Sequence, residues 1–423
     1  MHRVMLSGAS VFTLGLGLSA AALADGHADK GAVLGTYANI AQAMYEDSLT
    51  SAMALKTAVD ALAAEPSEET LAVAKETWLA ARVPYQQTEV YRFGNAIVDD
   101  WEGKVNAWPL DEGLIDYVDA GYGTESDENG FYTANLIANA SLQVGGQSID
   151  ASAINADLIQ RLHEVDEVEA NVATGFHVVE FLLWGQDLNG TDAGAGNRPH
   201  TDFDTANCTG GNCERRVEYL QTATDLIITD LEEMVANWTD GGAGRTAVTE
   251  ATPEEGLTAM LTGLGSLSYG ELAGERMKLG LLLHDPEEEH DCFADNTHNS
   301  HYYNIVGMQA IANGSYERID GSVIEGPSLM SLLPEDVSSS LDNDLKSTLA
   351  AATVMKEKAD SGEMAYDQML GEGNEEGKAV LQAVIDGLLT QTKSIETAVA
   401  ALELGGIDFE GSDSLDDPEA VFQ

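Results

Sequence analysis

The stretch Gly175-Phe176-His177-Val178-Val179-Glu180 sets two polar side chains into a run that is otherwise apolar. It continues directly into the apolar residues 181–184, and residues 154–165 upstream carry apolar side chains at helical spacing. We therefore expect one helix through this region, with Gly175 inside it at a kink or a close backbone approach. A histidine and a glutamate three positions apart share one helix face, with Cβ atoms roughly 5–6 Å apart. At that spacing both side chains reach a single cation, or the two simply pair with each other.

Length and charge set the first limits on function. A chain of 423 residues exceeds what one hydrophobic core usually serves, so two domains are expected. The 72 acidic residues against 20 basic ones give a net charge of −52, which repels phosphate backbones and anionic lipid headgroups. We therefore exclude nucleic acid as a partner. The same charge gathers cations without any specific site, so an acidic cluster alone does not indicate a metal centre.

The first 24 residues have the features of an export signal. Arg3 supplies the positive end, residues 4–18 form a short apolar region, and Ala22-Leu23-Ala24 is a small-residue cleavage site. No later run is long and apolar enough to cross a bilayer, so we expect no direct membrane span. The sequence predicts an exported protein.

Apolar residues at i, i+3, i+4 and i+7 recur along most of the remaining chain, and we find no convincing strand pattern. We predict an all-α fold of two helical-bundle halves, with residues 25–205 as the first half, 206–405 as the second and 406–423 as an acidic tail. Residues 94–130, 185–211 and 284–335 are expected to be long loops. The segments 174–183 and 361–370 resemble each other, which suggests that the halves arose as a degenerate internal repeat.

Three cysteines fit an oxidising compartment with one disulfide. Cys208 and Cys213 flank Thr-Gly-Gly-Asn, a flexible turn that can bring the two sulfurs together. Cys292 remains, either as a buried thiol or as a soft metal ligand.

Several motifs in order resemble the imelysin family, also called M75 peptidase-like or iron-regulated protein A-like. They are the G-x-H-x-x-E motif with the residues after it, and the segments 84–94, 108–117, 274–277 and 285–298. The resemblance implies an all-helical, two-part protein of iron uptake, periplasmic or associated with the outer membrane. It implies a metal ion or a small iron complex as ligand, and an inner- or outer-membrane iron-transport component as partner.

A metal site needs more ligands than His177 and Glu180. Glu89 is the third candidate, because it follows Pro84 in a family-like motif, and Arg92 one turn later would orient carboxylates or simply pair with Glu89. Imidazole and carboxylate groups also gather in a second cluster, which is either another site or a solvated acidic loop: Glu287, Glu288, Glu289, His290, Asp291, Asp295, His298 and His301. His290 and Asp295 match the family motif best. We expect Glu275 and Arg276 to form a buried pair beneath this cluster, and Trp108 to line a pocket or the core.

Two functions compete at this point. The first is a binding protein that captures iron for an uptake system. The second is a zinc metallopeptidase of the M75 type, although the H-E-x-x-H signature is absent: His163-Glu164 is followed by no second histidine. Haem capture through His177 is a third option. Iron is therefore the expected metal, with zinc and haem as alternatives.

Overall fold

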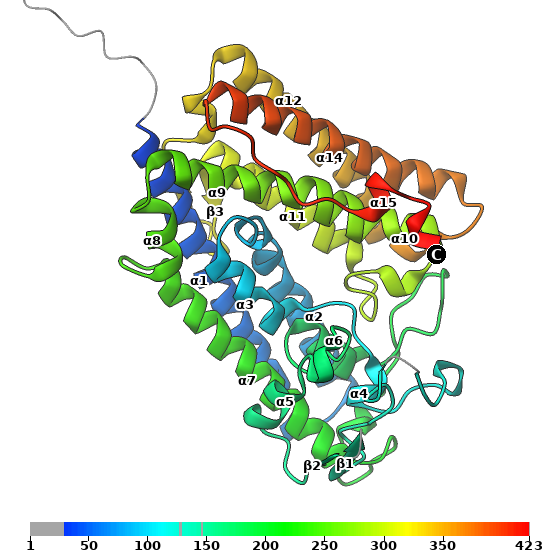
Figure 1. The fold of residues 1–423 in the computed structure, drawn as a ribbon. Coiled ribbons are helices and arrows are strands. Elements are labelled where there is room, and N and C mark those ends of the chain that lie inside the picture. The colour runs from blue at the N-terminus through cyan, green and yellow to red at the C-terminus, as the bar shows by residue number, and fades with distance from the viewer. Residues whose placement is uncertain (1–28, 127–128, 145–146, 423) are drawn as a thin grey trace, which may run out of the picture.

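Helices make up most of the computed structural model, which describes residues 29–126, 129–144 and 147–422 (Figure 1). The model is 64% helix and 3% strand, which confirms the all-α prediction. The strands form two small antiparallel hairpins: β1 (Ser141–Val144) with β2 (Gln147–Asp150), and β3 (Ser315–Glu317) with β4 (Val323–Glu325).

Three long helices build the first bundle, in the lower part of Figure 1: α1 (Lys30–Ala64), α2 (Glu68–Gln86) and α7 (Cys213–Trp238). The Ser67 hydroxyl accepts a hydrogen bond from the Thr70 amide, and Glu68 and Glu69 favour the positive end of the α2 dipole. Pro84 is accommodated inside the last turn of α2. Shorter helices complete this bundle: α3 (Ala96–Asn106), α4 (Glu112–Ile115), α5 (Ala156–Leu162), α6 (Phe176–Trp184) and α8 (Ala243–Thr249).

The second bundle lies above the first in Figure 1. α12 packs along α14, and α11 and η5 cover the pair. Its elements are α9 (Pro253–Ser266), the π-helix η5 (Leu267–Lys278), α10 (Leu279–Leu283), α11 (Thr297–Asn313), α12 (Glu335–Asp360), α13 (Tyr366–Leu370) and α14 (Glu375–Ala401). The tail returns over this bundle and carries α15 (Asp413–Asp416) near its end. α11 packs against α2, which joins the two bundles.

Single-turn 3-10 helices lie in the connections between these elements. They are η1 (Glu89–Tyr91), η2 (Ala120–Tyr122), η3 (Val165–Glu167), η4 (His200–Asp202), η6 (Pro286–Glu288), η7 (Leu329–Leu332) and η8 (Ala420–Phe422).

Two expected loops contain helices. α3 lies within residues 94–130, and α11 lies within residues 284–335. The first turns of α11 bury polar side chains, among them His301 and Asn304, so the apolar periodicity that marks a helix is missing there. The prediction of two long loops was wrong in these places. The polar buried face explains the error for α11, whereas α3 buries the apolar residues Val98, Trp101 and Val105 at helical spacing, which the prediction overlooked.

The structure also bears on the predictions about the cysteines and the membrane span, and leaves the export signal and the domain boundary untested. Cys208 and Cys213 form a disulfide with Cα atoms 5.8 Å apart, and Cys292 is a buried free thiol. No helix in the described ranges is long and apolar enough to cross a membrane. The export signal at residues 1–24 lies outside the described residues. The domain boundary near residue 205 and the internal repeat stay predictions; α7, assigned to the second half, runs along α1 of the first.

Candidate metal centre

The central motif begins a helix rather than continuing one. α5 ends at Leu162, and Gly175 is the N-cap of α6 with φ of 93°, a left-handed conformation that glycine adopts without strain. A Cβ at this position would lie 2.5 Å from the carbonyl oxygen of Val105, so α3 approaches the backbone closely. The expected continuous helix is therefore wrong, and the expected close approach is present. Every residue of α6 is buried, as its apolar composition requires.

His177 and Glu180 lie side by side on α6 and have no exposed surface. Nδ1 of His177 is 3.0 Å from Oε2 of Glu180, and the amide of Ala294 donates to the other carboxylate oxygen at 2.9 Å. Nε2 of His177 is buried without any hydrogen-bond partner. A carboxylate on one ring nitrogen fixes the ring and its tautomer, which leaves the other nitrogen available to a metal. Glu180 therefore serves as an orienting group for His177 in this geometry.

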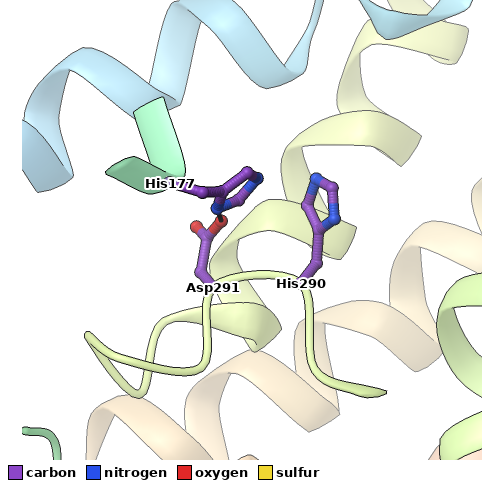
Figure 2. A group of neighbouring side chains, drawn as sticks. All are labelled: His177, His290 and Asp291. Carbon is purple, nitrogen blue, oxygen red and sulfur yellow. Dashed lines mark ion pairs between the residues drawn. The ribbon is translucent and has the colours of Figure 1, made fainter. Parts of the chain in front are cut away.

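The loop that precedes α11 brings two more donors to His177. His177, His290 and Asp291 each offer a ligand atom, and these atoms lie within 4.8 Å of one another. The two imidazole rings lie 4.7 Å apart between centroids, with the Asp291 carboxylate beside His177 (Figure 2). All three residues are buried, and no other group of three such donors occurs in the described ranges. The arrangement joins α6 of the first bundle to the second.

Arg82 on α2 holds Asp291 in place. Its guanidinium donates through Nη2 to Oδ1 at 2.7 Å and through Nε to Oδ2 at 3.3 Å. Ser300 and Asn296 also donate to Oδ2. Burial alone would raise the pKa of Asp291, but the charge of Arg82 and these hydrogen bonds lower it to about 2. Asp291 is therefore a carboxylate at neutral pH.

The two histidines are neutral at the same pH. Burial lowers the pKa of His177 well below its usual value, and the charge of Arg82 lowers it further. Burial likewise lowers the pKa of His290, helped by the charge of Arg276. The centre thus offers two neutral imidazoles and one carboxylate, the protonation states in which these side chains bind metals. Burial, with the nearby charge of Asp291, raises the pKa of Glu180 well above its usual range.

A second layer of polar contacts surrounds the centre. Asn106 on α3 accepts from Arg82 at 2.7 Å and lies 3.3 Å from Nε2 of His290. It also donates to Glu102 at 3.0 Å and to Glu89 at 3.4 Å. Asn106 therefore links the carboxylates of the first bundle to the histidine of the second.

Glu89, predicted as the third ligand, forms a buried ion pair. Nη2 of Arg276 is 2.7 Å from Oε2 of Glu89, and Nε of Arg276 donates to Glu271 at 2.7 Å. The π-helix η5 supplies both Arg276 and Glu271, and such helices occur often at functional sites. Glu275 is exposed, so the expected buried pair between Glu275 and Arg276 is wrong. The partners of Arg276 are Glu271 on the same element and Glu89 from a distant segment.

The remaining candidates lie around the centre at different depths. Trp108 packs on His177 with ring centroids 5.1 Å apart. Arg92 contacts Asp99 at 3.1 Å. Asp295 accepts from the amide of Gly194, and His298 pairs with Asp360 at 3.1 Å, so both have partners outside the trio of donors.

A cavity of about 690 Å³ opens beside the centre. The residues that line it include Asn106, Trp108, His290, Glu271, Glu275, Arg92 and Arg276. Sequence reasoning missed Arg82 and Asn106 completely. A buried arginine in a chain with 20 basic and 72 acidic residues is a weak signal, and only the fold shows which carboxylate it meets.

Comparison with known proteins gives a consistent result. The family model described as Imelysin, Peptidase_M75, matches residues 41–395. No curated protein matches the chain. A structure described as an iron-regulated protein A precursor from Parabacteroides distasonis ATCC 8503 is similar, with a TM-score of 0.60 and 17% identity over 88% of this chain and 95% of that one. An imelysin-like protein from Psychrobacter arcticum 273-4 gives 0.56 and 16% over 88% and 95%. At these identities the two structures show the shared fold.

Proposed function

Because the chain belongs to the imelysin family, we propose that it is an exported iron-handling protein that binds iron through His177, His290 and Asp291. The observation that carries the proposal is the buried trio itself, in which Nε2 of His177 has no partner. Leaving a buried polar nitrogen without a partner costs about 1–3 kcal/mol, and a bound ion would remove that cost.

The donor set favours a first-row transition metal. Two imidazoles and one carboxylate with further positions open suit ferrous iron, and zinc accepts the same ligands. Glu180 would fix the ring of His177, and Arg82 would hold Asp291. Glu89 would act through Arg276 rather than as a ligand. The mature protein would deliver its ion to an iron-transport component of the inner or outer membrane.

Metal titration of the mature protein tests this proposal. Anaerobic calorimetry with ferrous ion, beside elemental analysis, should give one ion per chain. His177→Gln and His290→Gln should each lose that binding, whereas His200→Gln, outside the centre, should keep it. Equal binding by all four proteins, with equal circular dichroism, would contradict the assignment.

One observation favours a second candidate, a zinc metallopeptidase. Glu102 lines the cavity, and burial with the charge of Glu89 raises its pKa to about 7, a value suited to a general base. Zinc on the trio with an open position would supply the activated water. Cleavage of a generic peptide by the zinc-loaded protein, lost in both His177→Gln and Glu102→Gln, would support this candidate. Cleavage that survives His177→Gln would come from a contaminant.

A further inference from the structure

The cavity beside the centre is far more acidic than the chain as a whole. Eight of its seventeen lining residues are acidic, whereas the whole chain has 72 in 423. The acidic set is Asp99, Asp100, Glu102, Glu164, Glu169, Glu271, Glu275 and Glu288. The overall acidity of the chain therefore does not explain the high share of acidic residues in the lining of this cavity, which we call the wall.

The two arginines in the wall are already paired. Arg92 lies within 3.7 Å of three carboxylates, those of Asp99, Glu102 and Glu271. Arg276 is held by Glu89 and Glu271. No other lysine or arginine lines the cavity, so among its described residues no guanidinium or ammonium is left to bind an incoming anion.

The cavity leads to the trio of donors. His290, a buried member of the trio, is one of the residues that line it, together with Asn106 and Trp108. Trp108 packs on His177, whose Nε2 is fully buried and has no partner. An ion in this cavity therefore meets the imidazole of His290, and the ring of His177 lies next to that imidazole.

We infer that the centre takes its metal as a free aquated cation through this acidic cavity, and that the wall rejects anionic chelates and haem. The inference rests on the proposed function and specifies its substrate. Size would not exclude a chelate, because a cavity of about 690 Å³ is within the range that holds small organic ligands. Charge does exclude an anionic chelate, because a cleft lined by negative groups concentrates cations and repels anions. Haem, with two carboxylates and a large apolar ring, fits neither this wall nor a histidine with no exposed surface.

The rate of metal capture tests the role of the wall. Trp108 beside His177 is a built-in fluorescent reporter, so stopped-flow mixing with Zn²⁺ follows binding directly. In the full-length mature protein, Asp100→Asn with Glu169→Gln removes two wall charges that have no ion pair. We expect association to slow by roughly threefold to tenfold at low ionic strength, and the difference to vanish in about 0.5 M salt.

A matched pair, Glu357→Gln with Glu396→Gln, removes two exposed charges of the second bundle that are not part of the cavity wall. It should leave the association rate within about twofold of wild type at low salt. An equal slowing by both pairs, or by neither, would overturn the role of the wall.

Ferric citrate tests the rejection of chelates. Protein incubated with ferric citrate that carries radiolabelled citrate should retain no label after gel filtration, whether or not it has taken iron. Retention of about one citrate per chain in wild type, lost in His290→Gln, would overturn the inference. If the wild-type protein binds free Zn²⁺ and also retains citrate from ferric citrate, only this inference fails. If it binds neither Zn²⁺ nor ferrous ion, the proposed function fails with it.

Discussion

Two buried polar clusters in this molecule both contain ion pairs, but only one of them also holds neutral imidazoles. Asp116 accepts from Arg198 at 2.7 Å and from Arg216 at 2.6 and 3.0 Å, and Asp202 accepts from Arg198 at 3.2 Å. Two carboxylates there meet two guanidiniums. At the centre, Arg82 pairs with Asp291, and the neutral imidazoles of His177 and His290 lie beside that pair. The nitrogens without a hydrogen-bond partner also differ, because Nε and Nη2 of Arg198 are donors only, whereas Nε2 of His177 can offer a lone pair to a metal.

The comparison separates structure from binding. A buried ion network whose charges balance needs no further ion, and its removal damages the fold. A cluster of neutral donors with a nitrogen free to coordinate a metal stabilises the folded protein when it binds a cation. Mutations in the first cluster should therefore mainly lower stability, whereas mutations at the centre should mainly lower metal affinity.

The largest effect should follow Asp116→Asn. Because it leaves Arg216 buried without a carboxylate and Arg198 with Asp202 alone, we expect a loss of about 3–5 kcal/mol in the free energy of unfolding, measured by urea denaturation. Metal affinity of the folded protein should stay unchanged. Asp192→Asn, at an exposed loop position, serves as the control. A loss of metal affinity without a loss of stability would reverse the roles of the two clusters.

His177→Gln should show the opposite pattern. Removal of a direct ligand should weaken metal affinity by at least about 100-fold by calorimetry, since even supporting groups contribute up to that amount. The metal-free variant should lose about 1–3 kcal/mol in the free energy of unfolding, less than Asp116→Asn, because it loses the contact with Glu180 and the ring packing on Trp108. A fully stable variant with wild-type affinity would show that the trio is not the site.

Glu180→Gln should have a smaller effect. The amide keeps the volume and a hydrogen bond to His177 but orients the ring less strongly, so affinity should fall about tenfold. A loss as large as that of His177→Gln would make Glu180 a direct ligand, as the spacing in the sequence first suggested.

The smallest expected effect is the release of a proton when the metal binds. Burial and the charge of Asp291 raise the pKa of Glu180, which favours the protonated form of its carboxyl group in the metal-free protein. A bound cation favours the carboxylate form of Glu180, so metal binding should release about one proton. Metal affinity should therefore rise with pH until the pH exceeds the pKa of Glu180 in the metal-free protein. The lowered pKa values of His177 and His290 mean that neither contributes near pH 6.5. Calorimetry in buffers of different ionisation enthalpy should count that proton in wild type and none in Glu180→Gln.

Sequence reasoning reached what depends on local spacing. The helical class and the meeting of His177 with Glu180 on one face both follow from periods of three to four residues. Contacts between distant segments were out of reach. Arg82 and Asp291 are 209 positions apart, and only the packing of α2 against α11 brings them together.

Polar burial also limited the prediction. α11 was predicted as loop because the face it buries carries hydroxyl, amide and imidazole groups, which do not produce an apolar stripe. Gly175 was placed inside a helix, although its left-handed conformation starts one. Both errors adjoin the centre, where local preference and the needs of a site differ.

The most direct measurement is a crystal structure of the mature protein loaded with ferrous ion, with anomalous scattering at the iron edge. The account predicts one strong peak per chain, coordinated by a nitrogen of His177, a nitrogen of His290 and an oxygen of Asp291. A peak elsewhere, or full iron occupancy that leaves these three side chains uncoordinated, would contradict it.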